Sequence, residues 1–225
     1  MKIKEKHSIS EAAFNDIIRT CKLSGITLYK LRKALANLVP IEPALMDCCV
    51  RSCMAFTGDY ACLDHCSICN ERRYTSAETI PGKPRKQAVY WSPISLLRMQ
   101  YQSQERARSL LYRYQYTTSL EYAAGTHIQD VFDGTRYKEL LNSGYFQDPR
   151  DVALIASMDG YQVFQQKRDD CWIVMLINGN LPPSERVKKE NLIIAAMFPG
   201  PQQPKNINSF LQPLVEDLKK LEGEW

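Results

Sequence analysis

The chain of 225 residues lacks any long apolar run, internal repeat or low-complexity tract. Its start has no apolar stretch of the kind that a secretory signal needs, and no later segment is apolar enough to span a membrane. Hydrophobic residues make up 44% and charged residues 24% of the chain, which is ordinary for a soluble globular protein. We therefore expect one large domain or two small ones, with no membrane partner.

The chain also has no strong net charge, because 25 Asp and Glu residues nearly balance its 29 Lys and Arg residues. The distribution is nevertheless uneven: residues 72–116 contain nine basic and two acidic residues, a local charge of +7. Such a block suits a polyanion better than a neutral partner. The basic residues, which we predict to contact DNA, are Arg72, Arg73, Lys83, Arg85, Lys86, Arg98, Arg106, Arg108 and Arg113.

Aromatic residues are interleaved with this basic block. Basic side chains can neutralise phosphates while aromatic faces stack on bases or sugars, so the mixture favours nucleic-acid contact. A solvated helix face whose tyrosines pack inward explains the same pattern, and the sequence leaves both readings open. The aromatic residues are Tyr74, Tyr90, Trp91, Tyr101, Tyr112, Tyr114 and Tyr116.

Cysteine is concentrated rather than spread, since six of the eight cysteines fall within residues 48–69. A disulfide framework usually distributes its bridges through a fold, so this clustering indicates metal binding in a reducing compartment, the cytosol or nucleus. Two close pairs separated by a short polar loop suit a tetrahedral zinc site. We predict that the four ligands are Cys49, Cys53, Cys66 and Cys69.

Three nearby residues, Cys48, Cys62 and His65, compete for a place in this shell, and some of the cysteines could instead be ordinary buried thiols. A site closed by four thiolates leaves no open coordination position, so its zinc would stabilise a loop and perform no chemistry.

Periodicity and turn signals predict an α+β fold with a helical N-terminal part. We expect helices over residues 8–22, where Ser8 and Glu11 form a capping-box pattern, and onward from Thr27. Further helices are expected over 94–115, with a break near Ser103, over 135–142 and over 207–221. Three antiparallel strands are expected over 152–164, 171–179 and 191–198.

Asp159 follows the buried-looking run VALIASM and precedes a glycine. A carboxylate emerging from a central strand is a usual way to hold a divalent cation, as two-metal phosphoryl-transfer sites do. Asp-Gly between strand-like runs is also the standard type I′ hairpin turn, which the residues alone favour. Asp169 and Asp170 are interpreted as loop charge.

Three strands followed by a helix, with an acid on the first strand, is how an RNase H-like domain begins. That fold then needs a fourth strand with a second acid and a later helix with a third. We recognise neither in this chain, so the sequence predicts an incomplete RNase H-like domain.

Three ordered segments carry a family likeness: MDCCVRSCMAFTGDYACLDHCSICNERRY (46–74), DPRDVALIASMDGYQVF (148–164) and NLPPSERVKKENLIIAAMFPGPQQPKNINSFLQPLVEDLKKL (180–221). Together they resemble the CACTA (En/Spm-like) transposases, especially the fungal type. The resemblance implies a cut-and-paste DNA transposase with an RNase H-like core and three acidic ligands for Mg²⁺ or Mn²⁺. Asp159 would be the first of these acids, and the four cysteines would hold structural zinc. DNA and further transposase subunits would be the partners, in the nucleus.

The sequence departs mildly from the family pattern, with Val50 where proline is usual and Ser67 where C-P-x-C is usual. We expect four regions: a helical hairpin (1–45), a zinc-binding module (46–74), a basic helical region (75–147) and the first half of an RNase H-like domain (148–225). A fragment with one catalytic acid would be inactive alone. The alternatives are a non-catalytic zinc-containing module, derived from a transposase, that binds DNA or protein, and a wholly structural zinc protein.

Overall fold

A computed structural model describes residues 7–22, 25–38, 41–75, 82–125, 128–162, 170–200 and 202–223. The chain divides into two compact units, Met1–Glu42 and Pro43–Trp225, and each is described by itself. No helix in the described ranges combines the length and the hydropathy that crossing a membrane requires.

The first unit is a pair of helices, α2 (Glu11–Thr20) and α3 (Leu28–Leu38). The predicted capping box at Ser8 is wrong, because the cap is Ser10, whose hydroxyl accepts a hydrogen bond from the Ala13 amide at 3.1 Å. Thr27 accepts from the Lys30 amide at 3.2 Å, at the predicted start of the second helix. An ion pair of 3.3 Å between Arg32 and Glu11 links the two helices.

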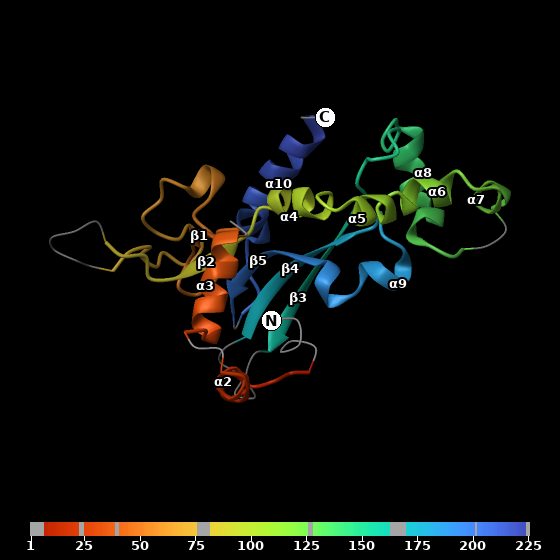
Figure 1. The fold of residues 1–225 in the computed structure, drawn as a ribbon. Coiled ribbons are helices and arrows are strands. Elements are labelled where there is room, and N and C mark those ends of the chain that lie inside the picture. Colours follow the sequence, from red (N-terminus) through yellow and green to blue (C-terminus); the bar gives the residue numbers. More distant parts are fainter. Residues whose placement is uncertain are drawn as a thin grey trace. The chain divides into compact units, whose positions relative to one another are not determined.

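The second unit is built on a five-stranded antiparallel sheet in the order β1-β2-β5-β4-β3 (Figure 1). Its strands are β1 (Ala44–Asp47), β2 (Gln87–Tyr90), β3 (Leu154–Gln162), β4 (Asp170–Asn178) and β5 (Leu192–Pro199). The α+β class is confirmed, and the three predicted strands are present. The expected number of strands was too small, because β1 and β2, on either side of the cysteine segment, extend the sheet through β5.

The main core lies on one face of this sheet, beneath α4 (Pro93–Gln100) and α10 (Ile207–Gly223). Side chains alternate between the two faces of a strand, so Val174 and Leu176 of β4 share this face. The Phe198 and Phe210 rings approach to 4.6 Å between centroids and join β5 to α10. The helix predicted over 207–221 is therefore confirmed, with its apolar stripe on the sheet.

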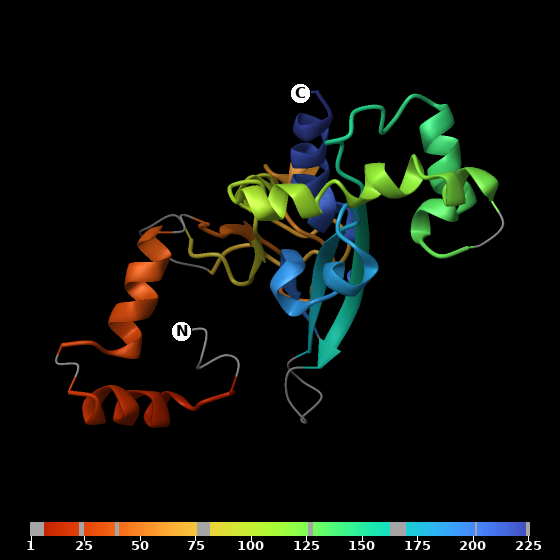
Figure 2. The ribbon, with the colours of Figure 1, turned by 45° about the vertical axis from the view of Figure 1, so that its right-hand side comes forward.

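Most of the remaining helices of this unit form a satellite beyond α4 (Figure 2). The helix predicted over 94–115 breaks at Ser103, as expected, and again at Leu110–Leu111. Its pieces and neighbours are α5 (Gln104–Ser109), α6 (Tyr112–Thr117), α7 (Leu120–Ala124), η2 (Val131–Asp133) and α8 (Thr135–Asn142). Phe132, Tyr137 and Ala153 form its small core. Short elements elsewhere are η1 (Gly58–Tyr60), α9 (Pro183–Arg186) and η3 (Lys189–Asn191).

Candidate metal centre

The four predicted ligands, Cys49, Cys53, Cys66 and Cys69, meet at one point. Their Sγ atoms all lie within 4.8 Å of one another, and the Sγ atoms of Cys49 and Cys69 are 3.4 Å apart. Tetrahedral zinc with Zn–S bonds of about 2.3 Å needs sulfur atoms about 3.8 Å apart. The donor set and its spacing therefore fit a zinc ion.

The first cysteine pair is held by a tight turn between paired backbone segments. Cys48 pairs with Ala55 across the turn, and the Cys49 amide donates to the Met54 carbonyl at 2.9 Å. Within the turn the Ser52 amide donates to the Cys49 carbonyl at 2.7 Å, and Ser52 has a left-handed φ of 57°. The turn brings both sulfurs to the same side.

The second pair repeats this arrangement. His65 pairs with Arg72, and the Cys66 amide donates to the Glu71 carbonyl at 2.9 Å. The Asn70 amide donates to the Cys66 carbonyl at 2.8 Å. Asn70 has a φ of 58°, a left-handed conformation that asparagine tolerates well. Two similar turns facing each other make a four-sulfur site.

The three competing ligands lie outside this group of four cysteines. Cys48 is buried in the main core, while Cys62 and His65 are exposed and lie outside the sulfur group. In the part of the chain that the structure describes, the four cysteines form the only group of three or more His, Cys, Asp or Glu residues placed closely enough to hold a metal ion.

Burial makes two of these thiols, those of Cys53 and Cys66, hard to ionise without a cation. Burial raises the pKa of Cys53 to about 12, and the pKa of Cys66 is also raised, chiefly by burial. Burial acts on Cys69 in the same direction, but hydrogen bonds, first of all from the Glu71 backbone, lower its pKa on balance. Because the ligands bind as thiolates, the metal must supply the free energy of deprotonation.

Asp159 lies within β3, opposite Ile173 of β4, and its side chain is exposed. The type I′ turn that the residues favoured is wrong, because Gly160 continues the same strand opposite Trp172. Strand alternation places Asp159 on the face opposite the helix-covered core. β3 is an edge strand of the sheet among the described residues. Asp170 begins β4 and is not a loop residue, whereas Asp169 lies outside the described residues.

Arg113 is the most deeply buried of the basic residues in the block. Its side chain is 1% exposed. Its guanidinium donates to the carbonyls of Asp151 (3.1 Å), Phe146 (3.3 Å) and Asp148 (2.6 Å) and to the Tyr137 hydroxyl (3.1 Å). Burial therefore contradicts a DNA contact by Arg113, because no phosphate reaches the guanidinium in this structure.

Other basic residues are also engaged within the protein. Arg73 forms an ion pair of 2.8 Å with Asp47, and Arg106 donates to the Asn191 side chain. Arg85 pairs with Glu71 at 2.9 Å. Lys86 donates to the Val50 carbonyl and the Ser52 hydroxyl, in the turn of the first cysteine pair. Four predicted DNA contacts are exposed and have no side-chain partner among the described residues: Arg72, Lys83, Arg98 and Arg108.

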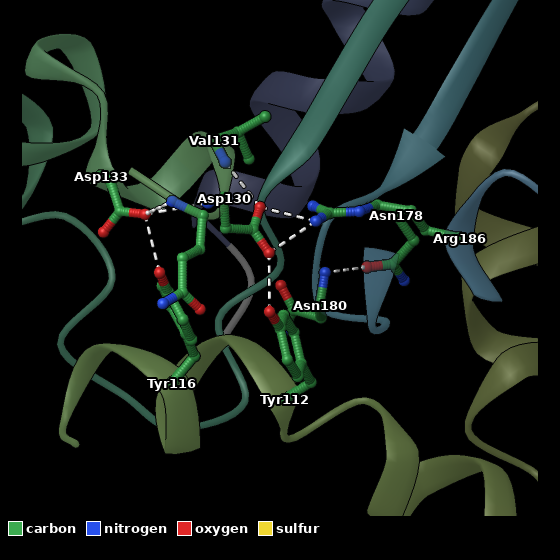
Figure 3. Close-up of polar contacts among 9 residues, drawn as sticks. Tyr112, Tyr116, Asp130, Val131, Asp133, Asn178, Asn180 and Arg186 are labelled. Carbon is green, nitrogen blue, oxygen red and sulfur yellow. Dashed lines mark hydrogen bonds and ion pairs between the residues drawn. The ribbon is translucent and has the colours of Figure 1, made fainter. Parts of the chain in front are cut away.

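Two tyrosines of the block point into the satellite rather than to solvent (Figure 3). The hydroxyls of Tyr112 and Tyr116 donate at 2.7 Å to the carboxylates of Asp130 and Asp133. Burial and the hydrogen bond to Asp133 raise the pKa of Tyr116 to about 12. These tyrosines follow the inward-packing alternative, whereas Tyr114 on the same helix is 39% exposed.

Arg186 is a buried residue that the sequence did not single out. It is 6% exposed, and its Nη2 donates to both carboxylate oxygens of Asp130 at 2.6 Å (Figure 3). Its Nη1 has no partner among the described residues. Asp130 and Arg186 are 56 residues apart, so no local spacing reveals the pair. The pair joins the satellite to the segment that follows β4.

Residues 126–224 match the family model described as Transposase family tnp2. The matched segment contains β3, β4, β5 and α10, and with them Asp159, but not the cysteine cluster. It supports the transposase likeness of the segments from 148 to 221. Comparison with curated proteins and comparison with solved structures gave no match.

Proposed function

We propose that this chain is the zinc-stabilised, DNA-contacting part of a CACTA transposase of the fungal type, and that it acts in the nucleus. The observation that carries the proposal is the tnp2 match, which spans the strand bearing Asp159. The cysteine group, upstream of the match, supports the proposal independently, because it has the geometry of a closed zinc site.

The zinc is proposed to be structural, since four thiolates leave no position for a substrate. It would hold a module that is bonded directly to the loop after β5 and to α10. The Asn206 amide donates to the Cys53 carbonyl at 2.8 Å, and the Ser52 hydroxyl donates to the Pro199 carbonyl at 2.6 Å. The Ala55 amide donates to the Ser209 hydroxyl at 2.9 Å. Metal binding would therefore stabilise one end of the sheet.

DNA contact is proposed for the exposed cations, of which Arg98 and Arg108 flank the break between α4 and α5. Each phosphate contact releases counterions, so affinity falls as salt rises. We expect the double change Arg98→Glu and Arg108→Glu to reduce the slope of log affinity against log salt by about 2. Fluorescence anisotropy with duplex DNA measures that slope. Arg136→Glu, an exposed change in α8, is the matched control.

A salt slope that is equal in the double variant and in the control would refute DNA contact through these helices. Binding that does not weaken as salt rises, or no binding at all, would favour a wholly structural zinc protein instead.

Asp159 is proposed as one acidic ligand of catalytic Mg²⁺ or Mn²⁺ in an RNase H-like domain. Supporting this, it is exposed at the middle of an edge strand, where acids from further structure or from further transposase subunits can approach it. Such a cation would polarise the phosphodiester and activate water. The residues of this chain would contribute one carboxylate and the DNA-contacting surface.

A second candidate is a non-catalytic module that binds DNA or protein. It is favoured by the isolation of Asp159, which joins no metal-holding group in the described part of the chain. A nicking assay with plasmid DNA and Mn²⁺ tests the enzyme. Cleavage by the chain that disappears in Asp159→Asn supports the enzyme and refutes the module, whereas DNA binding without cleavage agrees both with the module and with a transposase part that is inactive alone.

A further inference from the structure

Lys86 has an unusual environment for a lysine. It lies just before β2 and is only partly exposed. Its Nζ donates to the Ser52 hydroxyl at 2.8 Å, to the Gly200 carbonyl at 3.0 Å and to the Val50 carbonyl at 3.2 Å. All three acceptors are neutral, and within the described ranges Lys86 has no ion pair. A partly buried ammonium without a carboxylate is costly unless another negative charge lies nearby.

The metal-thiolate centre proposed above would supply such a charge. Val50 and Ser52, which bind the Lys86 ammonium, both lie in the turn between Cys49 and Cys53. Burial, the main influence, lowers the pKa of Lys86, while the charges of Cys48 and Cys49 act on it in the opposite direction. The ammonium is therefore directed at the first cysteine turn.

A divalent cation with four thiolates leaves two negative charges in excess, and three of the four sulfurs are on buried residues. Of the other cations near the site, two are already paired and a third is exposed to solvent. Arg51 and Arg85 both pair with Glu71, at 3.0 and 2.9 Å, and Arg51 is 65% exposed. Lys205, at the rim beside Cys53 and Cys69, is exposed to solvent.

We propose that Lys86 is the counter-cation of the metal-thiolate centre, a positioning residue that fixes the first cysteine turn and offsets the charge of the thiolates. This assignment replaces the DNA contact that the sequence predicted for Lys86. It rests on the metal site proposed above and adds a residue outside the ligand shell. Through the Gly200 carbonyl, the same ammonium ties the metal site to the end of β5.

The test uses the full chain loaded with Zn²⁺ or Co²⁺. Partners outside the ligand shell typically change metal affinity by 10–100-fold. We expect Lys86→Met to weaken zinc affinity by about tenfold or more in competition with a chromophoric chelator. The midpoint of Co²⁺ binding should move to higher pH, because thiolates form less readily without the ammonium. Lys86→Arg should restore both values, because it restores the charge.

Lys83→Met is the matched control, since it removes an exposed lysine three residues away and should leave zinc affinity unchanged. If Lys86→Met does not fold, Lys86→Gln repeats the test with a donor but no charge. Equal zinc affinity in wild type and in the uncharged variant overturns the role of Lys86 alone. A wild-type chain that binds neither Zn²⁺ nor Co²⁺ overturns the metal site itself, so the two failures are distinguishable.

Discussion

Replacing Asp130 by asparagine should be among the most damaging single changes in the second unit. The Asp130 carboxylate accepts two bonds of 2.6 Å from Arg186, one of 2.7 Å from Tyr112 and one of 2.6 Å from the Val131 amide. An asparagine side chain at this position would be similar in shape but neutral. Arg186 would then keep its positive charge in a site where its side chain is 7% exposed and its Nη1 already has no partner among the described residues.

Removing one member of a buried ion pair typically costs about 3–5 kcal/mol, because the other charge is left uncompensated. A loss of about 4 kcal/mol lowers the ratio of folded to unfolded protein roughly a thousandfold. With a urea m-value of about 2 kcal/mol/M, the unfolding midpoint should fall by about 2 M. The stacking of Arg186 on Phe132, at 5.8 Å, offsets little of this.

Urea unfolding of the full chain, followed by far-UV circular dichroism, measures the effect. Glu139→Gln is the control, because its ion pair with Arg136 is exposed and should contribute about 0.2–1 kcal/mol. Adding Arg186→Met to Asp130→Asn should recover at least about 1 kcal/mol, since the unpaired charge is gone. The reasoning is refuted if Asp130→Asn costs no more than Glu139→Gln, or if the double variant is less stable than Asp130→Asn.

Three further results are expected. Elemental analysis should find about one zinc per chain in the wild type and in Cys62→Ser, but strongly reduced zinc in Cys53→Ser. The reason is that Cys53 belongs to the group of four sulfurs and Cys62 does not. Burial alone would raise the pKa of Asp217, but its hydrogen bonds outweigh burial and lower that pKa. The carboxylate therefore stabilises the fold fully above the unfolded pKa of about 4, and this stabilisation is lost as pH falls through the lower folded pKa. The stability difference between wild type and Asp217→Asn should shrink below about pH 4. Phe210→Ala should cost about 3–5 kcal/mol in thermal unfolding, because Phe210 is fully buried against β5.

The features that the sequence predicted well are local ones. In the sequence β4 and β5 are continuous apolar runs, and α10 has apolar residues at helical spacing. Burial determines which positions of each element must be apolar, so these patterns are visible within a few residues. The cysteine turns are local too. A pair of cysteines three or four residues apart already brings two sulfurs together, and only the meeting of the two pairs needed the fold.

The features that the sequence missed depend on contacts between distant residues. Arg113 looked like a DNA contact because its charge is visible in the sequence, whereas the carbonyls that enclose it come from residues 146–151. Asp159 and Gly160 looked like a turn because the strand that keeps them extended, β4, begins only at Asp170. In both cases the tertiary structure overrode a local signal, charge for Arg113 and turn propensity for Asp159 and Gly160.

The sheet order has a consequence for synthesis of the protein. β1 pairs with β2, and the cysteine turns lie between them, whereas β2 meets β5 where Tyr90 pairs with Ala196. At about 5–20 residues per second, roughly 5–20 s separate the emergence of these two strands from the ribosome. The nascent chain therefore presents all four thiols, and the hairpin that encloses them, well before the strand that completes the sheet exists. If the proposed zinc binds during translation, the late strands would add to an edge that the metal has already ordered.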